Sequence, residues 1–164
     1  MFKRSVSTLV LGVVALSPSL AFGVDDARSA IHIKANIPTQ QFHVQPRDPE
    51  FGKHEVMHYD PLNDDLGILR HTFDVKNTEG SINAYIEGGR AFLSSGNSMI
   101  PLSVRFNGVR LDSLPREVVD DASSTPGTQV EMTIRADAMP VERHPGFYTG
   151  DFTVIYDAVP RISA

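Results

Sequence analysis

The 164-residue chain is acidic, because 20 aspartates and glutamates against 15 lysines and arginines give a net charge of −5 at pH 7 with neutral histidine. Such a chain is poorly suited to bind nucleic acid or an anionic membrane, both of which attract basic surfaces. It contains no cysteine, which excludes disulfides, a thiol nucleophile and cysteine metal sites. One domain of this length must therefore be stabilised by its core, by assembly, or by both.

Residues 1–23 predict a secretory signal peptide. Lys3 and Arg4 precede an apolar run over residues 10–16, and small residues follow it. The run is well short of the ~20 apolar residues that span a bilayer, which argues against a membrane anchor. Cleavage after Ala21 and cleavage after Gly23 both fit, and Gly23 is our first choice. Removal of the peptide takes two of the 15 basic residues and no acidic ones, so the exported chain is more acidic still.

The rest of the chain repeatedly alternates apolar and polar residues, the pattern of a strand with one buried face. The first such segment is 29–37, and its apolar face is formed by Ile31, Ile33, Ala35 and Ile37. Further segments of this period are 41–45, 71–77, 81–87, 99–106, 109–111 and 128–137. Asn107-Gly108 between two of them predicts a type I′ hairpin, which needs positive φ at both residues.

The C-terminal segment 146–158 is apolar on both faces, which predicts a central strand in a sheet packed on both sides. Residues 114–121 predict one or two helical turns. Clusters of turn-forming residues separate all these segments. Seven or eight short strands with this spacing predict one antiparallel, immunoglobulin-like β-sandwich.

Residues 54–58 read HEVMH and match the H-E-x-x-H zinc motif, in which two histidines bind the metal and the glutamate is a general base. The motif requires a helix, but Gly52 and Pro61 interrupt the helix that it would need. In a strand, the two histidines would stand ~13 Å apart and could not share one ion. A small secreted zinc metallopeptidase or metal-binding protein using His54, Glu55 and His58 is therefore the alternative, and we predict no enzyme, cofactor or metal site.

Four segments, in order, resemble the CS1-type (alpha-fimbrial, class 5) major pilins of the alternate chaperone-usher pathway. They are AIHIKANIP, HEVMHYDP, MIPLSVRFNGVRLDS and PGFYTGDFTVIYDA. The first is similar to the N-terminal extension of these pilins, the second to a strand ending in Tyr-x-Pro, the third to the central strand and hairpin, and the last to the closing strand. The likeness runs over nearly the whole exported chain and includes the lack of cysteine.

The resemblance implies a structural pilus-shaft subunit that supports adhesion and whose sandwich lacks one strand, which donor-strand exchange supplies. Residues 24–38 would be the donor extension and residues 39–164 the pilin domain. The interface residues would be Ile31, Ile33, Ala35 and Ile37, with Pro38 as hinge and with Tyr148, Phe152, Val154 and Tyr156 at the groove or chaperone contact. The implied partners are other copies in a head-to-tail polymer, a periplasmic chaperone, an outer-membrane usher and a tip adhesin. The implied location is the cell-surface fimbrium, reached through the periplasm.

Overall fold

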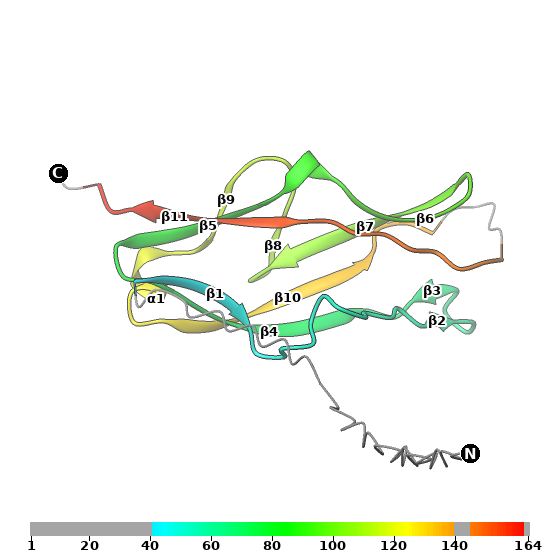
Figure 1. The fold of residues 1–164 in the computed structure, drawn as a ribbon, viewed down its shortest axis with the longest axis horizontal. Helices are drawn as coiled ribbons and strands as arrows, with labels where there is room; N and C mark the ends of the chain where they lie inside the picture. The colour runs from blue at the N-terminus through cyan, green and yellow to red at the C-terminus, as the bar shows by residue number, and fades with distance from the viewer. Residues whose placement is uncertain (1–40, 140–144, 163–164) are drawn as a thin grey trace, which may run out of the picture. The chain divides into compact units, whose positions relative to one another are not determined.

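The larger of two facing antiparallel sheets is built around three long strands with alternating apolar residues. The computed structural model describes residues 41–139 and 145–162. In this sheet the strands lie in the order β1 (Phe42–Pro46), β4 (Leu69–Asn77), β10 (Thr128–Ala136), β7 (Ser98–Phe106) and β6 (Ala91–Ser95), and β8 (Val109–Arg110) also pairs with β7 (Figure 1).

The smaller sheet has three strands, in the order β11 (Val154–Pro160), β5 (Gly80–Ile86) and β9 (Arg116–Val119). A two-stranded hairpin joins β2 (Tyr59–Asp60) to β3 (Asp65–Leu66), and the helical turns are η1 (Glu87–Gly89) and α1 (Asp121–Ser124). No helix in the described part of the chain is long and apolar enough to cross a membrane.

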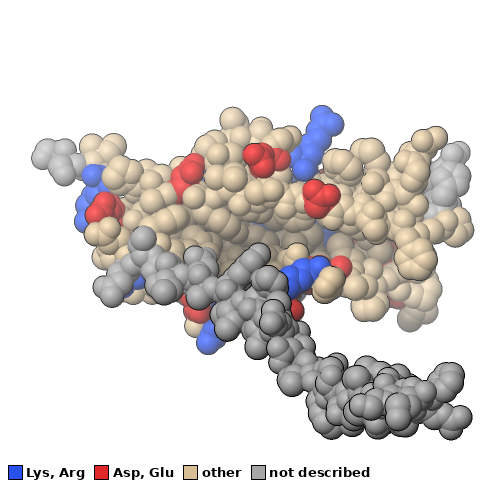
Figure 2. Space-filling model, in the orientation of Figure 1, with Lys and Arg blue, Asp and Glu red and all other residues tan. Residues whose placement is uncertain are grey.

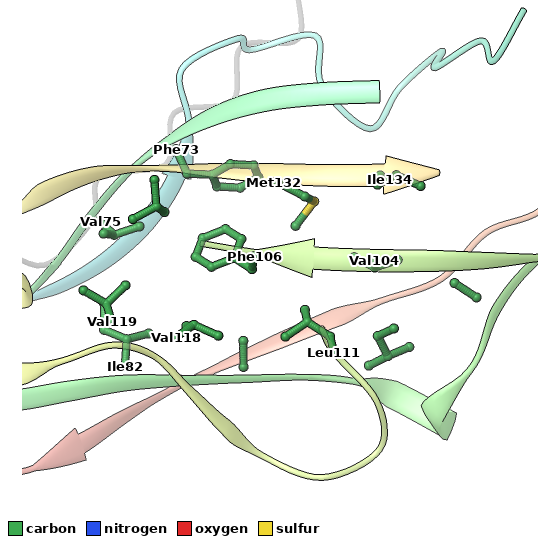
Figure 3. Packing of buried hydrophobic residues seen from close by; sticks show 14 of the residues in the cluster. Phe73, Val75, Ile82, Val104, Phe106, Leu111, Val118, Val119, Met132 and Ile134 are labelled. Carbon is green, nitrogen blue, oxygen red and sulfur yellow. The ribbon is translucent and has the colours of Figure 1, made fainter. Parts of the chain in front are cut away.

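The core lies between the two sheets and uses the faces that the period-two pattern predicts. Every second residue of β5 is buried, and the same alternation runs through the inner part of β4 and through β10. Phe73 and Phe106 meet edge to face with their ring centroids 5.2 Å apart, a favourable aromatic geometry. Figure 3 shows these rings and Met132 on the large sheet, facing Ile82, Val118 and Val119 from the other layer.

The predicted hairpin is confirmed at Asn107 and Gly108. Both residues have positive φ, 49° and 79°, and Phe106 pairs with Val109 across the turn. The side-chain amide of Asn107 donates a hydrogen bond to the carbonyl of Val118, 2.6 Å away. This bond ties the turn to the small sheet, so a local signal in the sequence also fixes a contact between the layers.

The strand order is that of an immunoglobulin-like sandwich with one strand missing. In such a sandwich the first, second, fifth and fourth strands form one sheet, and the third, sixth and seventh form the other. Strands β1, β4, β10 and β7 match the first sheet in that order, and β5 and β11 match the third and sixth strands. Among the described residues no strand occupies the seventh place, beside β11. The prediction of an incomplete immunoglobulin-like sandwich is confirmed.

The predictions for two segments are wrong, and one strand was missed. Strand β11 begins at Val154 rather than near Gly146, and within the described ranges it is an edge strand rather than a central one, because only β5 pairs with it there. Within 114–121 the chain forms β9, with Val118 and Val119 buried against β5, so tertiary burial overrides the weak helical preference. Strand β6, which carries a short apolar segment before a turn, was not predicted.

Candidate functional site

A groove of about 1310 Å³ opens on the side of the sandwich where β1 and β11 are edge strands. Among the described strands, β1 pairs only with β4 and β11 pairs only with β5. An edge without a partner strand presents N–H and C=O groups that another strand can pair with. Figure 2, which has the orientation of Figure 1, shows few charged side chains among uncharged ones on the face that carries β11. An extended apolar segment is the ligand that such a site suits.

The large sheet forms the floor of the groove with the inward-facing side chains of five strands. Strand β1 contributes Val44 and Pro46, and the floor continues with Leu69, Phe73, Leu93, Ile100, Leu102, Met132 and Ile134. Phe73, Met132 and Ile134 are also part of the buried core, so the groove reaches the core of the sandwich directly.

The C-terminal segment forms one wall. The four predicted contact residues, Tyr148, Phe152, Val154 and Tyr156, all line the groove. Phe152, Val154 and Tyr156 pack against the core but stay half-buried. The hydroxyl of Tyr148 donates to Ser98 Oγ, 2.9 Å away, which holds this ring against the start of β7.

Tyr156 contacts the aromatic residues of the core directly. Its ring centroid lies 5.0 Å from that of Phe106 and 6.5 Å from that of Phe73. Its hydroxyl is buried and has no hydrogen-bond partner among the described residues, and this burial raises the pKa of the phenol well above its ordinary value. A buried hydroxyl without a partner is destabilising, so an occupant that supplied one would bind more tightly.

Gly150 lets the chain pass from the large sheet to the small one. Just before it, Thr149 and Ser94 exchange two backbone hydrogen bonds of 2.8 and 3.0 Å. A Cβ atom at Gly150 would lie 2.0 Å from the carbonyl oxygen of Phe92, so only glycine allows this approach. The crossing then delivers Phe152 to the groove wall.

The segment 51–59, which contains HEVMH, forms the other wall. Phe51 packs on His71 and Phe73, with ring centroids 4.3 and 5.4 Å away. Glu55 accepts a hydrogen bond from the backbone N–H of Gly52 at 3.1 Å, and its other oxygen lies 3.0 Å from Nε2 of His71. The glutamate of the motif therefore anchors a loop onto β4.

The zinc alternative finds no support in this geometry. Residues 54–58 have no helix, as predicted, but they are an irregular segment rather than the strand considered above, because Glu55 pins the loop to His71 instead of joining a ladder. His54 and His58 are both exposed. Among residues 41–139 and 145–162, no three histidine, aspartate or glutamate side chains are grouped so as to hold a metal.

The residues predicted for the C-terminal contact line the groove, whereas the floor and the loop wall were not predicted as parts of a site. Most floor residues lie on the apolar faces of predicted strands, but a period-two pattern does not distinguish a face that is covered from one that is open. Phe51 and Met57, apolar residues within a turn-rich stretch, were the available signal for the loop wall. The predicted donor residues 31, 33, 35 and 37 and the hinge at 38 lie outside the described residues and stay predictions.

Comparisons with known proteins agree with the fold. Residues 27–157 match the family described as CS1 type fimbrial major subunit. Among solved structures, the chain is similar to the CooA pilin subunit from enterotoxigenic Escherichia coli, with a TM-score of 0.56 and 18% identity, over 70% of this chain and 86% of that chain. That identity supports the fold alone. No curated protein matches the sequence.

The family match covers residues 27–157 of 164. It therefore includes all the strands that line the groove, except for the last residues of β11 after Asp157. Members of this family are structural proteins of surface pili, exported and then polymerised. The chain belongs to the family of CS1-type fimbrial major subunits, and it is a subunit of a pilus shaft at the cell surface.

Proposed function

We propose that the subunit polymerises by strand donation, in which residues 29–37 of one copy fill the groove of the next. The observation that supports this is the position of the groove, between two edge strands and at the place of the missing seventh strand. A strand inserted there pairs with the main chain of an edge and covers the apolar floor in one step.

The proposed donor face matches the floor in chemistry. Burial of the side chains of Ile31, Ile33 and Ile37 would stabilise a junction by about 2 kcal/mol each. Together they would contribute about 6 kcal/mol before any main-chain pairing is added. Because the arm of one copy enters another copy, the contact is head-to-tail and does not close, which yields a fibre.

The partners follow from the same groove. Subunits of this family assemble into pili with a chaperone and an usher. In our proposal a chaperone strand fills the groove in the periplasm, and at the usher the arm of the next subunit replaces it. The first subunit of the shaft would give its arm to a tip adhesin with an equivalent groove. Tyr148, Phe152, Val154 and Tyr156 would contact each of the successive strands.

The test is a fusion in which a second copy of residues 29–38 follows the C-terminus through a short flexible linker. We expect the exported chain alone to aggregate or polymerise, since its groove is an apolar surface between open edges. The fusion should be a soluble monomer by light scattering. The same fusion with Ile33→Asp in the grafted copy is the matched control and should behave like the chain alone. A monomeric unfused chain would contradict strand donation.

A further inference from the structure

The two ends of the described sandwich differ in a way that bears on how copies meet. We call the end with the β4–β5 turn the turn pole and the end with the β2–β3 hairpin the hairpin pole. Strand β1 starts and β11 ends at the turn pole, because Phe42 pairs with Asn77 and Pro160 pairs with Gly80. Figure 1 shows the C-terminal segment and the β2–β3 hairpin at opposite ends.

The hairpin pole presents a large apolar side chain on a well-fixed turn. Leu62 is 92% exposed at the tip between β2 and β3. Asp60 accepts hydrogen bonds from the backbone N–H of Leu62 at 2.9 Å and from the side chain of Asn63 at 2.6 Å. The hydroxyl of Tyr59 donates to Asp64 at 2.5 Å. These bonds fix the backbone of the turn that carries Leu62.

The turn pole presents a second exposed apolar side chain. Ile162 is 93% exposed and directly follows Arg161, whose backbone N–H donates to the carbonyl of Glu79 at 2.6 Å. The guanidinium of Arg161 donates to both carboxylate oxygens of Asp121, each at 2.5 Å. The end of β11 is therefore fixed beside α1, and Ile162 directly follows this fixed end. Singly exposed apolar residues are common, so these two matter only if the poles meet.

Strand donation, on which this inference rests, brings opposite poles together. The seventh strand of an immunoglobulin-like sheet runs antiparallel to the sixth, so the inserted arm would run from the turn pole of the acceptor to its hairpin pole. The body of the donor starts with β1, at its own turn pole. Residues 37 and 42 are five positions apart and span at most ~18 Å. The turn pole of the donor is thus held next to the hairpin pole of the acceptor.

We propose that Leu62 of the acceptor packs against Ile162 of the donor, forming a second contact between successive subunits. The partner is a second copy of this chain, and the surface is continuous with the groove, because Tyr59, Leu66 and Phe147 at the hairpin pole also line it. The second contact sets the angle between neighbouring subunits, whereas the arm alone would leave them hinged at Pro38.

Engineered disulfides test the proposal directly, because the chain has no native cysteine. Fibres of the Leu62→Cys/Ile162→Cys variant, oxidised and boiled in detergent without reductant, should run as a ladder of covalent oligomers. Each single variant should run as a monomer. The control pair Leu62→Cys/Leu114→Cys uses an exposed residue on the loop between β8 and β9, and it should also give no ladder. Fibres that are visible by electron microscopy but give only monomers from the Leu62/Ile162 pair would overturn the proposal.

A second measurement does not depend on disulfide formation. Leu62→Ser and Ile162→Ser should each make fibres dissociate ~10-fold faster in denaturant, and the double variant should be no faster than the singles because one contact is lost in every case. Rates that match wild type, or that multiply, would refute the contact. A failure of strand donation would give a different result. If fibres carrying Ile33→Asp still formed and still gave the Leu62/Ile162 ladder, the contact between the poles would be supported and the donor role of the arm would be refuted.

Discussion

Gly150→Ala is a sharp test of the way in which the chain builds the groove wall. The added Cβ atom would lie 2.0 Å from the carbonyl oxygen of Phe92 and 3.3 Å from Cα of Leu93. Both neighbours are backbone atoms, so no side-chain rotation relieves the clash. A real contact needs more than 3 Å, which means that the two backbones must separate by about 1 Å.

The magnitude follows from what that separation breaks. The two hydrogen bonds between Thr149 and Ser94, 2.8 and 3.0 Å long, are at the same crossing and would be lost at about 1 kcal/mol each. Displacing Phe152, which packs half-buried against the core, adds about 1 kcal/mol. The free energy of unfolding should therefore fall by about 3 kcal/mol, which for a domain of this size lowers Tm by about 10 °C.

Thermal unfolding of the arm-fused monomer, followed by circular dichroism, measures this loss. Gly146→Ala is the matched control on the same segment: its nearest neighbour is Ser95 Oγ at 3.1 Å, a side chain that can rotate away. We expect that variant to stay within about 1 kcal/mol of the parent. If Gly150→Ala were as stable as Gly146→Ala, the tight crossing at Phe92 would be wrong.

Three further predictions follow. Ile33→Asp should leave the body folded and abolish fibres in electron micrographs, because it puts an unpaired carboxylate into an apolar groove. His32→Asp, on the opposite face of the arm, should still assemble. Fibres from Ile33→Asp would contradict the proposed donor face. Hydrogen bonds from Arg161 lower the pKa of Asp121 from 3.8 to about 2, so this pair stabilises the fold above about pH 4 and stops doing so as the pH falls through about 2. Asp121→Asn should thus lower the unfolding midpoint at pH 7 but not near pH 2, and an equal loss at both would contradict it. Native mass spectrometry should find no stoichiometric zinc, and zinc that is lost in His54→Ala would reopen the metal site.

The fold was predictable because its signals are local. Alternation in 71–77, 81–87 and 128–137 identified β4, β5 and β10, since a strand with one buried face must repeat every two residues. The Asn107-Gly108 turn was predictable for a similar reason, because few residue pairs accept positive φ twice. Burial and turn chemistry act over a few residues, and they can be recognised without knowledge of the partner strand.

The errors concern features that depend on distant residues. Nothing near 116–119 shows that these residues will pair with β5, some thirty positions earlier in the chain. Likewise, Glu55 matched a zinc motif by sequence, and its actual contact, His71, lies 16 residues away on β4. The residues of the motif are present, but they bind zinc only when they lie on a helix. The backbone of this segment is irregular instead.

The largest error, at β11, supports the proposed function. Residues 152, 154 and 156 have the composition of a central strand, yet they are half-buried, and Ala158 on the same face is exposed, whereas the inward residues of β5 are fully buried. In the part of the chain that the structure describes, the strand therefore lacks both a full cover for its inner face and a partner for its outer edge. Edge-to-edge pairing of two β11 strands would satisfy the main chain but leave the groove of about 1310 Å³ empty. An inserted apolar strand would meet both needs at once, and this is why we propose that β11, whose sequence is that of a central strand, takes its second neighbour from another subunit.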